Sequence, residues 1–309
     1  MSRAYVFPGQ GAQTIGMGLA LAEAYPAAKA VFEEVDQALG QALSKLIWEG
    51  DIDTLTMTAN AQPALMATSL AAMRALETEG LAWDGVSHVA GHSLGEYSAL
   101  CAAGSISLSD TARLLRIRGD AMQSAVPVGE GAMAAILGLS FEDVSALVAE
   151  AAMDDVLNAA NDNDPAQVVV SGCKAAVERA VALAKDIGAK RALLLPVSAP
   201  FHCALMAPAA EAMAEALATT EIAAPRVPLV ANVLASPIDS ADEIRSRLVE
   251  QVTGRVRWRE SVGYMAENGV DQIWEVGAGK ALSGMIRRIA RDVACSPVGT
   301  PDDISALKA

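Results

Sequence analysis

Short apolar runs alternate along the chain with longer segments in which apolar residues recur every three or four positions. The short runs are typical of buried strands and lie at 3–7, 86–90, 227–232 and 270–276. The longer segments predict helices at 63–79, 94–103, 108–122, 241–252 and 277–290. Strands and helices that alternate in this order are typical of a mostly parallel α/β sheet.

The middle of the chain follows a different order. Its predicted elements are a strand at 132–137, a helix at 141–152, a strand at 156–160, a turn at 161–165, a strand at 167–171, a helix at 174–187 and a strand at 191–197. The order β-α-β-β-α-β is that of a ferredoxin-like unit. We therefore expect a small ferredoxin-like domain at 127–198, inserted into a larger catalytic domain that comprises 1–126 and 199–309.

Composition and charge argue against several classes of function. The 309 residues are 52% hydrophobic but only 4% aromatic, which predicts a large core of Ala, Val, Leu, Ile and Met. The net charge of −14 argues against a nucleic-acid partner, because it would repel the phosphate groups. The longest uncharged run, 192–210, contains Pro196, Pro200 and Pro208, so no membrane-spanning helix is predicted there.

The cysteines and the first residues bear on the compartment. The four cysteines are far apart and form no C-x-x-C pair, so neither a zinc site nor a disulfide framework is predicted. The first eight residues contain no long apolar segment of the kind found in signal peptides. We expect a reducing, cytoplasmic setting.

Gly91, Ser93 and Gly95 form a G-x-S-x-G motif between the predicted strand at 86–90 and the predicted helix at 94–103. A sharp strand-to-helix turn presents its central hydroxyl above the sheet, and the flanking positions must be nearly free of side chain. Ser93 is therefore a candidate nucleophile. The alternative is that Ser93 only caps the helix, since Ser is a favoured N-cap residue.

A serine nucleophile needs a base, and histidine is the usual one near neutral pH. The chain has three histidines. His88 lies within the predicted strand, and His92 directly precedes Ser93, so its side chain should point away from the serine hydroxyl. His202 lies in a loop bounded by prolines. Elimination favours His202 over His92, and no motif marks a carboxylate that would orient the base.

Arg118 falls on the apolar side of the predicted helix at 108–122, for which Ser109 is the expected N-cap. It lies four residues from Leu114 and three from Leu115. Burying an unpaired guanidinium is costly, because the group cannot lose its charge. Arg118 therefore needs an anionic partner, which is either a carboxylate of the protein or a carboxylate of a ligand.

Two glycine-rich turns resemble phosphate-binding loops without completing the fingerprint. The pattern that begins at Gly9 has Thr14 in place of its last glycine, and the pattern that begins at Gly277 has Leu282 there. A nucleotide site is therefore not predicted. The turn after the first strand either ends that strand or lets backbone N–H groups near Gln10 approach a ligand closely.

Five motifs follow one another along the chain. They are Phe7-Pro8-Gly9-Gln10-Gly11, Gln62-Pro63-Ala64-Leu65, Gly91-His92-Ser93-Leu94-Gly95-Glu96-Tyr97-Ser98-Ala99, Arg118-Gly119 and Pro200-Phe201-His202-Cys203. In this joint order they resemble the malonyl-CoA:acyl carrier protein transacylase family, along essentially the whole chain. The resemblance implies an α/β-hydrolase-like core with a ferredoxin-like insertion, which agrees with the order of predicted elements.

The resemblance also implies roles for individual residues. Ser93 would be the nucleophile and His202 the general base, with the ring of His202 oriented by the backbone carbonyl of Gln251. The backbone N–H groups of Gln10 and Leu94 would form the oxyanion hole.

The implied reaction is ping-pong transfer of a malonyl group from malonyl-CoA to the phosphopantetheine thiol of acyl carrier protein, through a malonyl ester of Ser93. Arg118 would bind the malonyl carboxylate and so select malonyl over acetyl groups. Phe201 would crowd the α-carbon of the acyl group and disfavour methylmalonyl. We expect a monomer that supplies fatty-acid synthesis and uses no cofactor and no metal.

Three alternatives stay open at this point. A polyketide acyltransferase that acts on separate synthase modules fits the same motifs. A serine hydrolase would use water as the acceptor, but it would not need Arg118 on an apolar face. A carrier-binding scaffold would keep the fold without forming any acyl-serine.

An acidic carrier protein would need a local basic patch on this acidic chain. The candidate residues are Lys190, Arg191, Arg287, Arg288 and Arg291. The alternative is that these side chains are ordinary solvated charges at helix and strand ends.

Overall fold

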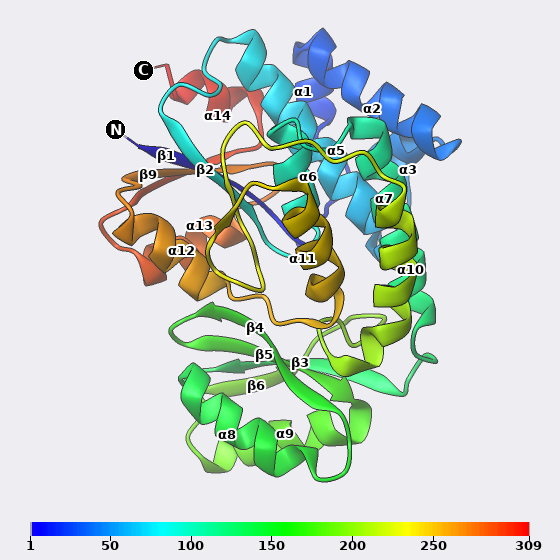
Figure 1. The fold of residues 1–309 in the computed structure, drawn as a ribbon, viewed down its shortest axis with the longest axis vertical. Helices are drawn as coiled ribbons and strands as arrows, with labels where there is room; N and C mark the ends of the chain where they lie inside the picture. The colour runs from blue at the N-terminus through cyan, green and yellow to red at the C-terminus, as the bar shows by residue number, and fades with distance from the viewer. Residues whose placement is uncertain (1, 309) are drawn as a thin grey trace.

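The computed structural model describes residues 2–308, which form two sheets and the helices around them (Figure 1). The larger sheet has the strand order β10-β9-β1-β2-β7-β8, and its neighbouring strands are parallel except for β7 and β8. The mostly parallel α/β sheet predicted from the apolar runs is confirmed. Its strands are β1 (Arg3–Phe7), β2 (Val86–Gly91), β7 (Leu229–Val230), β8 (Pro237–Ile238), β9 (Gln272–Val276) and β10 (Ala294–Val298).

Helices cover both faces of this sheet, because successive side chains of a strand point to opposite sides. In β1, Tyr5 and Phe7 belong to the core that contains α5 (Thr58–Thr78), whereas Ala4 and Val6 belong to the core that contains α12 and α13. The remaining helices are α1 (Leu19–Ala24), α2 (Pro26–Leu39), α3 (Leu43–Glu49), α4 (Ile52–Thr56), α6 (Gly95–Ala102), α7 (Leu108–Ser124), α10 (Ala207–Ala218), α11 (Ala241–Thr253), α12 (Trp258–Glu267), α13 (Ala281–Ile289) and α14 (Pro301–Ala306), with a short 3₁₀ helix at Ala204–Met206.

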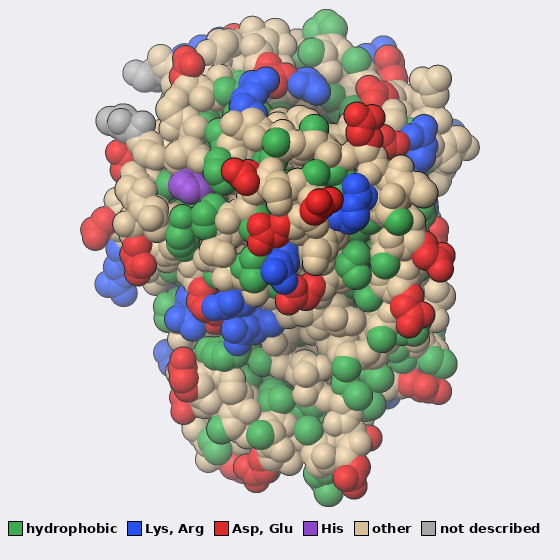
Figure 2. All heavy atoms as spheres, in the orientation of Figure 1, with side chains coloured by type: hydrophobic (Ala, Val, Ile, Leu, Met, Phe, Trp, Pro, Cys, Tyr) green, Lys and Arg blue, Asp and Glu red, His purple; other side chains and the backbone are tan. Residues whose placement is uncertain are grey.

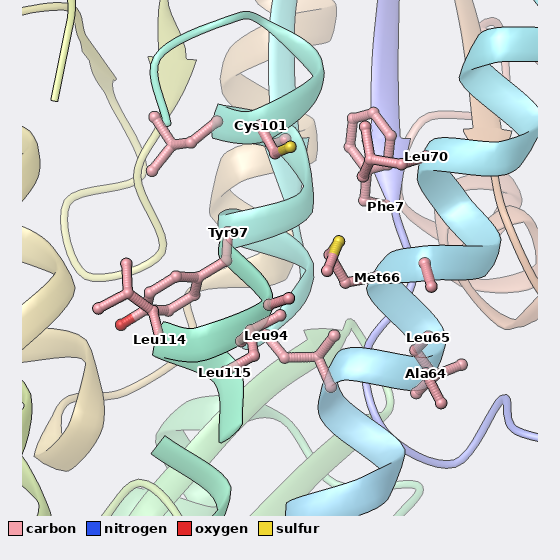
Figure 3. Packing of buried hydrophobic residues seen from close by; sticks show 14 of the residues in the cluster. Phe7, Ala64, Leu65, Met66, Leu70, Leu94, Tyr97, Cys101, Leu114 and Leu115 are labelled. Carbon is pink, nitrogen blue, oxygen red and sulfur yellow. The ribbon is translucent and has the colours of Figure 1, made fainter. Parts of the chain in front are cut away.

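The larger core lies between α5 and the helices α6 and α7. Figure 3 shows Met66 of α5, Leu94 at the start of α6 and Leu115 of α7 directed into the space between these helices. These side chains are almost fully buried. Because α6 follows the G-x-S-x-G turn, this packing holds the turn at the end of β2.

Two local predictions about helix starts are wrong. The pattern places Pro63 in a first turn, but α5 begins at Thr58 and carries Pro63 in its second turn, where the proline forgoes a single hydrogen bond. Ser107, and not Ser109, caps α7, since its hydroxyl accepts from the backbone N–H of Asp110. The hydroxyl of Ser109 instead donates to Glu34.

The smaller sheet is antiparallel throughout and has the strand order β4-β5-β3-β6. One of its faces packs on its two helices, whereas Met133, Ala135, Ala160 and Val169 on the other face join the larger core. Its elements are β3 (Gly131–Leu137), α8 (Phe141–Ala152), β4 (Leu157–Asp164), β5 (Gln167–Cys173), α9 (Lys174–Asp186) and β6 (Arg191–Leu194).

The turn expected at 161–165 is wrong, because β4 continues through Asp164. Tertiary partners hold this polar segment in extended form. Arg259 of α12 pairs with Asp162, and Arg288 of α13 pairs with Asp164, at 2.8 and 2.7 Å respectively. The backbone N–H of Asp162 also donates to the carbonyl of Val256, at 2.9 Å. These contacts join β4 to the larger part of the molecule.

Candidate active site

The G-x-S-x-G turn connects β2 to α6 and holds Ser93 in a strained conformation. Ser93 has a φ of 54°, in the left-handed region that non-glycine residues rarely adopt. A Cβ at Gly91 would lie 1.9 Å from the carbonyl of Gly95, and a Cβ at Gly95 would lie 2.2 Å from the carbonyl oxygen of Phe7. Both glycines are therefore required for the turn to pack against itself and against β1.

Asn232 anchors this turn from the segment that follows β7. Its side-chain oxygen accepts from the backbone N–H of Ser93 at 2.8 Å, and its side-chain nitrogen donates to the carbonyl of Gly91 at 2.6 Å. Sequence reasoning missed Asn232, because an asparagine after a short strand carries no motif.

Ser93 and His202 lie within hydrogen-bond distance, with 2.7 Å between Oγ and Nε2. The other ring nitrogen of His202, Nδ1, lies 2.9 Å from the carbonyl oxygen of Gln251 and 3.1 Å from that of Gly254. Two carbonyl acceptors require the proton on Nδ1, so Nε2 is free to accept from the serine hydroxyl. The ring is thus oriented by backbone carbonyls and by no carboxylate.

The other two histidines bond elsewhere. Nε2 of His92 lies 2.9 Å from the side-chain oxygen of Asn163, and Nδ1 of His88 lies 3.0 Å from the hydroxyl of Ser87. The choice of His202 over His92 as the partner of Ser93 therefore agrees with the geometry.

Burial, and after it the positive charge of Arg118, lowers the pKa of His202 to about 3. The imidazole is consequently neutral at physiological pH while the cavity holds no ligand. A neutral imidazole is the form that can accept a proton from Ser93.

Arg118 lies on α7 with 1% of its surface exposed, and its guanidinium reaches the nucleophile. Nη2 donates to Oγ of Ser93 at 3.1 Å and to the side-chain oxygen of Gln251 at 2.8 Å. Nη1 donates to the side-chain oxygen of Gln62 at 2.7 Å, while Nε has no hydrogen-bond partner among residues 2–308. Within residues 2–308 no carboxylate pairs directly with Arg118, so of the two partners that the sequence leaves open, a ligand carboxylate fits better.

Glu96 is a buried carboxyl group in the first turn of α6. One of its oxygens accepts from the backbone N–H of Asn232 at 3.3 Å, and the other accepts from the side-chain nitrogen of Gln251. Desolvation raises the pKa of Glu96 to about 7. Sequence reasoning quoted this residue within the serine motif but gave it no role, although a glutamate on a buried helix face is a signal by itself.

Gln10 and Leu94 are the two residues whose backbone N–H groups the resemblance assigns to an oxyanion hole. Both residues line the cavity in front of Ser93, and neither N–H donates a hydrogen bond to any residue in the range 2–308. The side-chain oxygen of Gln10 accepts from the hydroxyl of Thr58, which fixes the turn after β1. Two free N–H groups beside a nucleophile are suited to stabilising an oxyanion.

The cavity has a volume of about 560 Å³ and lies between the two sheets. The turn after β2, the helix α7 and the loop before the 3₁₀ helix contribute Ser93, Arg118 and His202, while the smaller sheet contributes Met133, Asn161 and Val169. Phe201, which precedes His202, also lines the cavity. The volume of the cavity falls in the range that is typical of small-molecule sites.

Two further features were searched for over residues 2–308. No group of three His, Cys, Asp or Glu side chains in that range is placed to hold a metal ion. None of the helices in the same range has the length and apolar character needed to cross a membrane.

Comparison with known proteins shows which family the chain resembles. The acyl transferase domain family matches residues 4–250. The malonyl CoA-acyl carrier protein transacylase of Escherichia coli (strain K12) is 46% identical over 303 residues, which cover 98% of this chain and 97% of that protein. The enzyme of the same name from Bacillus subtilis (strain 168) is 45% identical over 302 residues, 97% of this chain and 94% of that protein.

The chain belongs to the malonyl-CoA:acyl carrier protein transacylase family. Solved structures agree with this assignment. An acyl-carrier-protein S-malonyltransferase from Bartonella henselae is 56% identical with a TM-score of 0.96, over 99% of this chain and 98% of that one. A malonyl-transacylase in complex with a type II PKS acyl carrier protein is 42% identical with a TM-score of 0.96, over 99% and 98%. The resemblance inferred from the five motifs is confirmed at the level of this transacylase family.

Proposed function

We propose that this chain transfers a malonyl group from malonyl-CoA to the phosphopantetheine thiol of acyl carrier protein, through a malonyl ester of Ser93. One observation carries the proposal: the hydroxyl of Ser93 contacts both the neutral base His202 and the buried cation Arg118. The first contact generates a nucleophile, and the second places a positive charge where the carboxylate of the acyl group arrives.

The first half-reaction loads the enzyme. Oγ of Ser93 attacks the thioester carbonyl while Nε2 of His202 takes its proton, and the N–H groups of Gln10 and Leu94 stabilise the oxyanion. The C–S bond then breaks, and the imidazolium returns the proton to the departing sulfur of CoA. In the second half-reaction the carrier thiol gives its proton to His202 and attacks the ester, so that Ser93 leaves as the alcohol.

Arg118 also couples acyl binding to the base. Burial is the main cause of the low pKa of His202, and a malonyl carboxylate on the guanidinium offsets the second cause, the charge of Arg118. The pKa of His202 therefore rises once the acyl group is bound, which favours the imidazolium that forms during transfer. An acetyl group brings no such charge and leaves the base at its depressed pKa.

We expect the rate at which Ser93 is acylated by acetyl-CoA to be nearly independent of pH on the acidic side of neutrality. An ordinary histidine with a pKa near 6.5 would be only about 10% neutral at about pH 5.5. Because the pKa of His202 is lowered to about 3, it stays neutral there, and kcat/KM for acetyl-CoA, whose acyl group has no carboxylate to pair with Arg118, changes less than about twofold between roughly pH 5.5 and 7.5. Initial rates of CoA release over this range check it, and a tenfold fall toward the acid end would contradict it.

Of the residues proposed for carrier docking, Lys190 and Arg191 lie at one end of the smaller sheet, and the other three lie on or just after α13. Arg191 pairs across β6 and β3 with Leu137, which in turn lies opposite Gln167 of β5. Gln167 lines the cavity and lies opposite Asp164, the partner of Arg288. Figure 2 shows Lys and Arg side chains interspersed with Asp and Glu side chains near the junction of the two sheets on the face it displays.

Arg288 differs from its neighbours, because its charge is already paired with the nearly buried carboxylate of Asp164. Arg287 is exposed and forms no ion pair within residues 2–308, so it is the better docking candidate. We expect Arg287→Glu to raise the KM for carrier protein about three- to tenfold without changing the KM for malonyl-CoA.

Steady-state kinetics with each substrate varied in turn measure this effect. The matched control is Lys29→Glu, the same charge change on α2, where the side chain pairs only with Glu33 on the surface. Equal changes in both KM values, or the same change in the control, would remove Arg287 from the docking surface.

Several structural expectations accompany the proposal. We propose that 127–198 is an inserted ferredoxin-like domain, supported by its strand order and antiparallel pairing, within an α/β-hydrolase-like core at 1–126 and 199–309. The reaction as derived uses only side chains and backbone of this chain and its two substrates. We propose a monomer in the cytoplasm, which the reducing setting inferred from the cysteines supports.

Intact-protein mass spectrometry tests the function directly. After brief incubation with malonyl-CoA, the wild type gains one malonyl group, and addition of the phosphopantetheine form of acyl carrier protein removes it and yields malonyl carrier. If the ester instead turns over at the same rate without a carrier, the chain is a hydrolase. If no ester forms at all, the transfer mechanism is wrong. Fatty-acid and polyketide carriers supplied side by side identify the acceptor.

A further inference from the structure

Glu96, Gln251 and Arg118 form a chain of hydrogen bonds that ends at the nucleophile. The amide of Gln251 donates through Nε2 to Glu96 and to the carbonyl of Ser93, the latter at 3.0 Å, and accepts through Oε1 from Arg118 at 2.8 Å. All of these side chains are buried, so no solvent can replace a missing partner. The position of the guanidinium therefore depends on the position of one glutamine amide.

We infer that Glu96 is a positioning residue for malonyl selection, which sets the guanidinium of Arg118 through the side chain of Gln251. The inference rests on the proposed function. Glu96 does not touch the cavity itself, since it is absent from the residues that line it, so it acts through its neighbours.

Both groups that bond to the side chain of Glu96 are hydrogen-bond donors. The backbone N–H of Asn232 and the amide nitrogen of Gln251 both donate to it, one to each oxygen. An ionised carboxylate is acceptor-only and satisfies both donors. A glutamine in its place has one oxygen and one NH₂ group, so one of the two contacts would bring a donor against a donor.

The conflict would be relieved at Gln251. The N–H of Asn232 belongs to a backbone that is held by the side chain of the same residue, which bonds to Ser93 and Gly91. The amide of Gln251 is held only by side-chain torsions, so we expect it to rotate in preference to the backbone of Asn232, and this movement would withdraw Oε1 from Arg118. Arg118 would then keep Gln62 as its only side-chain amide acceptor and lose its fixed approach to Ser93.

A purely electrostatic role would act in the opposite direction. Glu96 brings a negative charge near Arg118, and removing that charge would strengthen the attraction of Arg118 for a malonyl carboxylate. Neutralising Glu96 therefore lowers the preference for malonyl over acetyl groups if the residue positions the guanidinium of Arg118. It raises this preference if the residue acts by charge alone. The sign of the change separates the two roles.

The experiment measures the ratio of malonyl-ester to acetyl-ester formation rates by quenched intact-protein mass spectrometry. We expect Glu96→Gln to lower this ratio about tenfold. A general loss of folding or of nucleophile reactivity lowers both rates together and leaves the ratio unchanged. An unchanged or raised ratio in Glu96→Gln overturns the inference.

A double-mutant cycle tests the route through Gln251. Gln251→Met keeps the backbone carbonyl that faces His202 and removes the amide. In that background Glu96→Gln should change the ratio by less than about twofold, because no amide remains to be positioned. An undiminished tenfold effect there means that Glu96 does not act through Gln251 and overturns the inference.

A second variant covers the case in which Glu96→Gln does not fold. Glu96→Asp keeps the charge and withdraws the carboxylate from Gln251 by one methylene group, so the ratio again falls if Glu96 is a positioning residue. An unchanged ratio in Glu96→Asp overturns the inference. The wild type reports separately on the function: if it forms no malonyl ester, the proposed function itself fails, whatever the variants show.

Discussion

Ser93→Ala takes up no acyl group from malonyl-CoA or acetyl-CoA, and its transfer activity falls by at least about 10³-fold. The hydroxyl of Ser93 lies 2.7 Å from the base and 3.1 Å from Arg118, and alanine offers neither a nucleophile nor a hydrogen bond to either. His202, Arg118 and the backbone N–H groups of Gln10 and Leu94 stay in place, but no nucleophilic oxygen remains between them. Intact-protein mass spectrometry after incubation with each thioester checks the result.

Ser98→Ala is the matched control for this variant. Ser98 lies on α6 one turn beyond the nucleophile, and its buried hydroxyl has no hydrogen-bond partner within residues 2–308. Removing it therefore costs little and leaves ester formation intact. An acyl ester that persists on Ser93→Ala would place the nucleophile elsewhere and contradict the mechanism.

Arg118→Ala loses its preference for malonyl over acetyl groups. A charge-assisted, bidentate hydrogen bond to a carboxylate contributes about 3 kcal/mol to binding of the malonyl group. The rate of malonyl-ester formation therefore falls about 10²-fold more than the rate of acetyl-ester formation. Acetyl loading falls only a little, because an acetyl group has no carboxylate and loses only the contact between Arg118 and the serine hydroxyl. The ratio of the two ester-formation rates measures the change.

Arg116→Ala is the control on the same helix. Arg116 bonds to Asn60 and Gln41 and does not line the cavity, so its loss leaves the ratio of malonyl to acetyl loading unaltered. Arg118→Lys keeps the charge but not the planar fork, and we expect it to fall between the wild type and Arg118→Ala. Malonyl preference that survives in Arg118→Ala would assign carboxylate binding to another residue.

The parts of the site that the sequence predicted depend on local chemistry. Gly91 and Gly95 mark a turn too tight for side chains, and a serine between them is exposed by that turn whatever surrounds it. The helical period of apolar residues places Arg118 on the buried side of its helix. A charged residue in a buried position is therefore recognisable before any fold is known. The sheet likewise follows from apolar runs that are long enough to bury both of their faces.

The parts that the sequence missed depend on partners that are distant along the chain. The polar segment 161–164 is typical of a turn, yet it is a buried strand because Arg259 and Arg288 neutralise its carboxylates. Asn232 holds Ser93 across 139 positions of sequence. The conformational preferences of single residues do not include such contacts. The free energy of a tertiary ion pair or hydrogen bond easily exceeds the preference of a few residues for a turn.

By itself, the sequence determined the alternation of strands and helices, the nucleophile turn and the family to which the chain belongs. Only the tertiary structure decided that the guanidinium of Arg118 reaches the serine hydroxyl, that backbone carbonyls alone orient His202, and that the buried carboxyl of Glu96 bonds to Gln251. The physical reason is that hydrogen bonds are effective only within about 3 Å and at defined angles. Residue type and spacing show which groups are present, and packing decides which of them meet.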